Sequence, residues 1–281
     1  MSKLDDLVAE VSVTKRLVSI AAGRADQAAL LGGPGPDGRL RGGSYSYASL
    51  ATTIQAAAAG LTWRGLRPRD VVGVLAPDVV GFTLAVHAVR AAGGVPSPVD
   101  VSLCAAEVAG QLAESGARMV ITAPPLTDTA LLAVDRSWVR QVYSFADAPG
   151  ATRFSDLLGL DMIRPSRGRP DDVALLPFSR GQDGRLRPVP VSHRELVELV
   201  DRADQGAGIT HRDVVLAVPP VGNGLGYAAV IDSALLRGAS VVAVQGQEIN
   251  TAADAHRATA VLVPKNAGLA VPDSVRAIPV E

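Results

Sequence analysis

Two pairs of adjacent polar residues are the first candidates for chemistry in this sequence. Ser192 and His193 are of the types that form a nucleophile and its base, and Asp171 and Asp172 are of the types that form paired carboxylates. Adjacent residues at the start of a helix point in different directions, and the sequence shows no nearby acid that would orient the histidine. We therefore expect Ser192 to cap a helix, His193 to pack or bind backbone beside it, and the two aspartates to lie in a solvated turn.

Few other residues could support redox or metal chemistry. Cys104 is the only cysteine, which excludes an internal disulfide and a thiolate metal cluster within one chain. The four histidines lack the spacing that presents two ligands on one helical face, so we predict no metal site. We interpret His87 as a core or boundary residue of a helix and Cys104 as a small buried residue.

Short apolar strands that alternate with helices must position these residues. The expected strands are 71–76, 95–99, 118–123, 141–145, 173–178, 214–218, 240–244, 260–263 and 275–280. The expected helices include an amphipathic one within the first twenty residues, one capped by Asp78, one capped by Ser102, and those at 225–236 and 252–257. Residues 28–31 and 44–47 are typical of a hairpin with a turn-rich connection. This alternation predicts an α/β fold with mostly parallel sheets covered by helices.

The chain is expected to form two lobes. Residues 164–170 are rich in proline, arginine, serine and glycine, which is typical of a connection. We predict a first lobe at residues 1–168. Residues 169–281 are predicted to hold a loop-bearing strand and helix and the second lobe.

The segment 178–193 (FSRGQDGRLRPVPVSH) sets a polar, glycine-containing loop between an expected strand and an expected helix. It resembles the phosphate-binding motif of the adenylate-forming (AMP-binding, acyl-CoA synthetase-like) superfamily, which is approximately Tyr-Ser-Ser-Gly-Thr-Thr-Gly-x-Pro-Lys-Gly. Residues 46–50 (SYASL), 65–72 (GLRPRDVV) and 91–99 (AAGGVPSPV) are similar to three further segments of that family, in the same order. The resemblance implies a truncated and degenerate N-terminal domain of such an enzyme, with two βα lobes.

In that family, loop hydroxyls, backbone amides and a lysine hold the ATP phosphates. The resemblance places the ligand-binding positions at Ser179, Arg180, Gly181, Gln182, Asp183, Gly184, Arg187, Asn223 and Gly224. Asp183 would put a negative charge near a polyphosphate, and Pro188 removes an amide and fixes φ. Arg180 and Arg187 could compensate electrostatically with a different geometry. We therefore assign no cofactor, and the substitutions count against ATP or AMP.

Asn223 and Gly224 belong to a second segment of the resemblance. Residues 213–224 resemble a strand and turn that border the acyl pocket in the family, with Asn223 at a histidine position. The resemblance implies a more open pocket wall. A glycine-rich turn that binds no ligand is equally compatible with these residues.

Three functions follow from the resemblance, and whether the chain is an enzyme stays open. The family's adenine- and ribose-binding motifs and its lysine-bearing C-terminal domain would lie beyond Glu281, so we do not expect adenylation by this chain alone. The favoured function is a repurposed scaffold that binds a small acyl or nucleotide-like ligand between its lobes, or runs different chemistry there. The alternatives are a split ATP-dependent carboxylate ligase that a partner chain completes, and a non-catalytic structural or regulatory partner.

Composition limits the partners. The net charge is -1 with scattered basic residues, so we expect no nucleic acid partner, and the apolar runs are too short to cross a membrane. The N-terminus lacks the pattern of a secretory signal, which predicts a cytoplasmic protein. A shortened core would uncover sheet edge and apolar surface, so we expect a homodimer or a complex with a partner protein.

Overall fold

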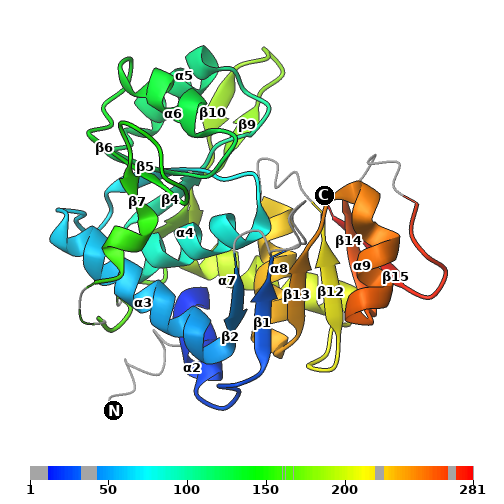
Figure 1. Cartoon of the computed structure of the whole chain (residues 1–281). Coiled ribbons are helices and arrows are strands. Elements are labelled where there is room, and N and C mark those ends of the chain that lie inside the picture. The colour runs from blue at the N-terminus through cyan, green and yellow to red at the C-terminus, as the bar shows by residue number, and fades with distance from the viewer. Residues whose placement is uncertain are drawn as a thin grey trace.

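Two mostly parallel sheets with flanking helices form the framework of the chain (Figure 1), which confirms the predicted α/β class. The structure is a computed structural model. It describes residues 12–32, 43–159, 161, 163–166, 168–218, 225–264 and 270–280. The helix expected within the first twenty residues lies partly outside these ranges, and α2 (Val13–Ala21) begins after the capping residue Ser12.

The first sheet has five parallel strands in the order β4-β3-β5-β6-β7. They are β3 (Val71–Leu75), β4 (Val95–Pro98), β5 (Met119–Thr122), β6 (Gln141–Ser144) and β7 (Thr152–Arg153). Val120 and Val142 pack on one face under α5 (Ala105–Ser115) and α6 (Thr127–Val134). Met119 and Ile121 face the opposite core, which includes α3 (Tyr47–Trp63) and α4 (Val79–Ala91). The strands are therefore buried on both faces, as their continuous apolar runs predict.

The second sheet has six strands in the order β15-β14-β12-β13-β1-β2. They are β1 (Ala28–Leu31), β2 (Ser44–Ser46), β12 (Val214–Ala217), β13 (Ser240–Ala243), β14 (Ala260–Pro264) and β15 (Arg276–Val280). The helices of this half are α7 (His193–Ala207), α8 (Leu225–Arg237) and α9 (Ile249–His256). β1 and β2 are antiparallel, as the hairpin prediction required, and β1 also pairs in parallel with β13.

The sheets do not follow the division at residue 168. β1 and β2 precede that position and yet complete the second sheet, because Leu30 pairs with Val241. The division into residues 1–168 and 169–281 stays a prediction as a domain boundary, but the N-terminal hairpin is structurally part of the second half.

Three local predictions were wrong. The strand expected at 173–178 is split into β8 (Val173–Leu175), which pairs with β11 (Val191–Ser192), and β9 (Phe178–Arg180), which pairs with β10 (Leu186–Pro188). Pro177 lies in the break and has no amide proton for a ladder. The N-cap of α5 is Cys104 rather than Ser102, so the Cys104 side chain is exposed and not buried.

Gly60 marks a close approach between α3 and the short 3-10 helix η1 (Phe154–Leu157). A Cβ atom at Gly60 would lie 2.7 Å from Leu157 Cα and against the carbonyl oxygen of the same residue. Gly60→Ala is expected to destabilise the protein by about 1–3 kcal/mol through overpacking. Gly110→Ala is the matched control, because a Cβ there meets no atom within 4 Å. It lies inside α5, so alanine is expected to stabilise by about 0.5–1 kcal/mol. Urea denaturation of both variants tests this, and equal effects would contradict it.

Candidate functional site

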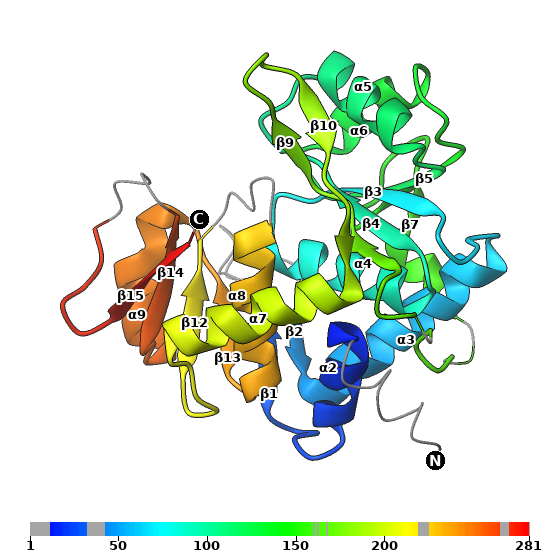
Figure 2. The same cartoon turned by 180° about the vertical axis from the view of Figure 1, so that it is seen from behind.

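The predicted phosphate loop forms a β-hairpin. β9 and β10 are antiparallel, with Ser179 opposite Arg187, and residues 181–185 connect them. The hairpin packs on α5 at the side of the first sheet (Figure 2), and Leu186 joins the apolar cluster under that helix. The structure thus gathers the candidates at 179–184 and Arg187 into one element.

The tip of this hairpin is closed by its own side chains. Arg187 Nη2 lies 2.6 Å from Asp183 Oδ2, and Arg180 Nη1 donates to Gly184 O at 2.6 Å. Gly181 N donates to Arg185 O at 2.9 Å, and Gly184 has the left-handed φ of 74° that favours glycine. The two arginines proposed to compensate, Arg180 and Arg187, are therefore engaged within the loop, whereas Arg185 at its tip is exposed and forms no ion pair with a described residue.

These residues do not fit the ATP triphosphate as a phosphate cradle does. Asp183 holds a carboxylate at the tip, 43% exposed, and its Oδ1 also accepts from Arg185 N at 3.2 Å. A bound phosphate would have to displace Asp183 from Arg187 and tolerate that carboxylate nearby. Pro188, the last residue of β10, has no amide hydrogen to donate, because it is a proline. Ser179 and Gln182 are exposed, and their side chains take no part in these contacts of the hairpin tip.

The second predicted segment is outside the described residues. Asn223 and Gly224 fall within 219–224, between the end of β12 and the start of α8. Their part in a ligand site stays a prediction.

A small recess lies beneath the hairpin. Its volume is about 70 Å³, and its lining residues are Pro98, Asp100, Gln111, Phe178, Arg180 and Leu186. Gln111 Nε2 donates to Pro98 O at 2.7 Å, and its buried Oε1 has no partner in the described part of the chain. A space of this size with an open acceptor suits one or two water molecules.

Ser192 and His193 have structural roles, as expected. Ser192 caps α7 and forms a capping box with Glu195, so its Oγ is bonded to that carboxylate and not to the histidine. His193 is largely buried, and its Nδ1 has no partner among the described residues. Burial first, and then the nearby positive charge of Arg90, lowers the pKa of His193 from 6.5 to about 4, against the smaller opposing effect of Asp172.

Asp171 and Asp172 do not act as a carboxylate pair. Asp171 is exposed and pairs with Arg194 at 3.0 Å, whereas Asp172 pairs with Arg69 at 2.6 Å. The hydrogen bond from the Arg169 amide, together with Arg69, holds the pKa of Asp172 below its usual range despite partial burial. The predicted turn is confirmed, and each carboxylate is fixed by a different guanidinium.

A buried polar network joins three helices, and the sequence analysis missed it. His87 Nε2 lies 3.0 Å from Asp232 Oδ1, and Arg90 Nη1 lies 3.3 Å from Asp232 Oδ2. His87 Nδ1 lies 2.9 Å from Thr14 Oγ1, and Arg90 Nε donates to Ala174 O at 3.0 Å. The network connects α2, α4 and α8 where the two halves of the fold meet.

The charges in this network are mutually compensated. Burial alone would raise the pKa of Asp232, but His87 and Arg90 outweigh burial and lower the pKa. Burial lowers the pKa of Arg90, and the Asp232 carboxylate opposes this. A charged residue inside an otherwise apolar helix, such as Asp232 in α8, is the signal that could have revealed the network.

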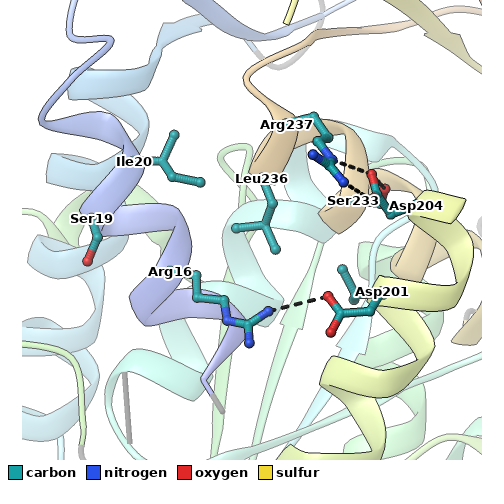
Figure 3. A pocket seen from close by; sticks show the side chains of 9 residues that line it. Arg16, Ser19, Ile20, Asp201, Asp204, Ser233, Leu236 and Arg237 are labelled. Carbon is teal, nitrogen blue, oxygen red and sulfur yellow. Dashed lines mark hydrogen bonds and ion pairs between the residues drawn. The ribbon is translucent and has the colours of Figure 1, made fainter. Parts of the chain in front are cut away.

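A pocket of about 430 Å³ lies between α2, α7 and α8 (Figure 3). Ile20, Val200 and Leu236 supply its apolar wall. Two ion pairs, Arg16 with Asp201 and Arg237 with Asp204, lie at its rim. Its lining includes none of the residues predicted for a ligand site.

The described ranges contain no group of three or more histidine, cysteine, aspartate or glutamate side chains that could hold a metal ion. Within the same ranges, no helix is long and apolar enough to span a bilayer.

Solved acyl-CoA ligases share this fold. FadD1, a long-chain-fatty-acid-CoA ligase from Archaeoglobus fulgidus, has a TM-score of 0.80 over 89% of this chain and 51% of its own length, at 17% identity. The inhibitor-bound N-terminal domain of FACL13 from Mycobacterium tuberculosis has a TM-score of 0.80 over 95% of this chain and 69% of its own, at 18% identity. The fold is thus that of the N-terminal domain of acyl-CoA ligases.

The sequence comparison then gives the family. The model of the AMP-binding enzyme family matches residues 19–267, and the chain belongs to this family. 4-Coumarate–CoA ligase 4 of Arabidopsis thaliana is 28% identical over 232 residues, which are 77% of this chain and 40% of that relative. 4-Coumarate–CoA ligase 2 of Solanum tuberosum is 27% identical over 215 residues, or 73% of this chain and 39% of that relative. The resemblance in the sequence is confirmed, and the chain spans about 40% of the length of these relatives.

Proposed function

We propose that this chain is a member of the AMP-binding enzyme family that does not adenylate carboxylates on its own. It binds a small acyl or nucleotide-like ligand between its lobes, or runs different chemistry there. The observation that carries the proposal is the closed hairpin, in which Arg187 is held by Asp183 and Arg180 by Gly184 O. The arginine donors of this loop bond to other groups of the loop, whereas the donors of a phosphate cradle are free for the ligand.

Calorimetric titration of the chain with Mg-ATP, AMP and a non-hydrolysable acyl-adenylate analogue tests this proposal, together with carboxylate-dependent release of pyrophosphate. We expect the acyl-adenylate analogue to bind, Mg-ATP and AMP to bind more weakly than about 1 mM, and no pyrophosphate to appear. Tight Mg-ATP binding with pyrophosphate release would refute the proposal.

The hairpin itself gives a sharper prediction. Asp183→Thr removes the tip carboxylate and frees Arg187, so we expect the affinity for Mg-ATP to rise by about tenfold, or 1.4 kcal/mol. Arg187→Ala should weaken the binding that remains. Asp201→Thr is the matched control, because Asp201 is an exposed aspartate paired with an arginine outside the hairpin. Calorimetry at millimolar nucleotide measures all three. Equal affinities for Asp183→Thr and the unaltered chain would show that phosphate does not meet this loop.

A second function is favoured by one specific observation. Because the chain spans about 40% of its curated relatives, a split ATP-dependent carboxylate ligase completed by a partner chain is the alternative. It requires a hairpin that opens, so under this alternative Asp183→Thr should leave the partner-dependent activity intact or raise it.

A further inference from the structure

Both tryptophans of the chain are exposed. Trp63 is the last residue of α3 and is 70% exposed, and Trp138 precedes β6 and is 66% exposed. Large aromatic side chains are costly to leave in water, and they are among the residues enriched where proteins bind one another.

The two segments that carry the tryptophans are linked by contacts. The Arg64 guanidinium lies 5.2 Å from the centroid of the Trp63 ring, and Arg64 O accepts from Gln141 Nε2 at 3.0 Å. Gln141 begins β6, and the preceding residue, Arg140, donates from its amide to Arg118 O at 2.9 Å. Trp138 is two residues before Arg140. We call this surface the arginine–tryptophan edge, and it consists of Trp63, Arg64, Arg118, Trp138 and Arg140.

This surface is strongly basic. The loops that enter β3, β5 and β6, at residues 64–70, 116–118 and 135–140, contain six arginines, two aspartates and neither lysine nor glutamate. Arg64, Arg118 and Arg140 are exposed and form no ion pair with any described residue. One of the two aspartates, Asp70, accepts a hydrogen bond from the Arg67 amide within its own turn. Arg64, Arg118 and Arg140 thus lack local compensation, whereas Arg69 of the same loops pairs with Asp172.

The charge and the residue types of the arginine–tryptophan edge indicate what kind of partner binds there. A symmetric dimer through this surface would bring arginine against arginine, which is unfavourable. The sequence pI is about 6.4, so the chain lacks the overall positive charge typical of a nucleic-acid-binding domain. Tryptophan and arginine are among the residue types enriched where most of the binding energy of protein interfaces is concentrated. We propose that the arginine–tryptophan edge docks a partner protein whose surface is acidic and apolar.

The docked partner would leave the hairpin accessible. The arginine–tryptophan edge lies at the amino ends of β5 and β6, whereas Arg180 of the hairpin shares its recess with Pro98, at the carboxyl end of β4. Because β3 to β6 are parallel, the amino ends of β5 and β6 and the carboxyl end of β4 lie at opposite ends of the strands of this sheet. The proposal is therefore independent of what the ligand site binds.

Intrinsic fluorescence tests the docking directly, because every tryptophan of the chain lies in the proposed surface. The probe is a synthetic amphipathic helical peptide of glutamate and leucine, compared with the same peptide carrying lysine in place of glutamate and with an oligothymidylate of similar length. We expect the glutamate peptide to shift the tryptophan emission with a dissociation constant on the order of micromolar, and the lysine peptide to have no effect.

Charge reversal locates the site. The double variant Arg118→Glu, Arg140→Glu is expected to bind the glutamate peptide at least tenfold more weakly, because like charges then face each other. The matched control is Arg202→Glu, Arg212→Glu, which makes the same change in net charge at exposed positions outside the edge and should bind normally. Equal binding of both peptides, tighter binding of the oligothymidylate, or equal effects of the two double variants would each overturn the proposal. So would sedimentation showing a dimer that Arg118→Glu, Arg140→Glu dissociates.

Discussion

Asp232→Ala is expected to lower the free energy of unfolding by about 3–5 kcal/mol. The substitution removes the carboxylate that accepts from both His87 and Arg90 in the buried network. The Arg90 side chain is only 1% exposed and already has one nitrogen, Nη2, without a partner in the described structure, so its charge would be left almost uncompensated. Removing one partner of a buried ion pair destabilises a protein far more than replacing both partners by apolar residues.

Urea denaturation of Asp232→Ala and of Asp201→Ala measures this effect. Asp201 pairs with Arg16 at the surface, so its loss is expected to cost less than about 1 kcal/mol. Asp232→Asn keeps one acceptor of similar shape and should fall between the two. A loss below 1 kcal/mol for Asp232→Ala would mean that water enters the network and solvates Arg90.

The stability of the protein should fall by roughly 3 kcal/mol as pH is lowered from 6.5 to 4, through His193 alone. Burial and the positive charge of Arg90 lower the pKa of this imidazole from 6.5 to about 4 in the folded chain. Between these two values the unfolded chain binds the proton and the folded chain does not. Protonation therefore favours unfolding progressively across this range, and the contribution of His193 is constant above it.

The measurement is the urea midpoint of the unaltered chain and of His193→Gln at several pH values. Glutamine cannot titrate, so the difference between the two curves isolates His193 from the other acid-sensitive groups. Asp172 and Asp213 have pKa values held below 3.8, so the stability that they add is lost mainly at lower pH. Parallel curves for the two proteins between pH 6.5 and 4 would contradict the prediction.

The fold was predictable because most of its strands are short runs made largely of apolar residues. β12, β13 and β14 were found within about a residue of their bounds, since turn residues flank each run. The hairpin strand β10 was not predicted, because Leu186, Arg187 and Pro188 have no strand pattern of their own and pair only through the register with β9. Helix α6 also escaped prediction.

The position of the candidate loop was predictable and its closed conformation was not, and its part in ligand binding stays a prediction. The resemblance to the family's phosphate-binding motif located the loop, and the residue types indicated that it departs from a phosphate cradle. The closure of Asp183 on Arg187 depends on the hairpin register, which the sequence does not display. The contacts of the buried network could not be predicted from the sequence, because His87 and Asp232 are 145 positions apart. Pairing over such distances is set by how helices pack and not by local pattern.

The place of β1 in the second sheet has a consequence for synthesis of the chain. Leu30 emerges from the ribosome early, but its parallel partner Val241 follows 211 residues later by the pairing register. At 5–20 residues per second, that interval is about 10–40 s.

The first sheet uses only residues from 71 to 153, so all its strands are available long before Val241 is made. The β1–β2 hairpin waits throughout with one edge unpaired, and two-stranded hairpins are marginal in water. Because an unpaired strand edge can pair with other chains, this N-terminal hairpin is exposed to misassociation until β13 is made.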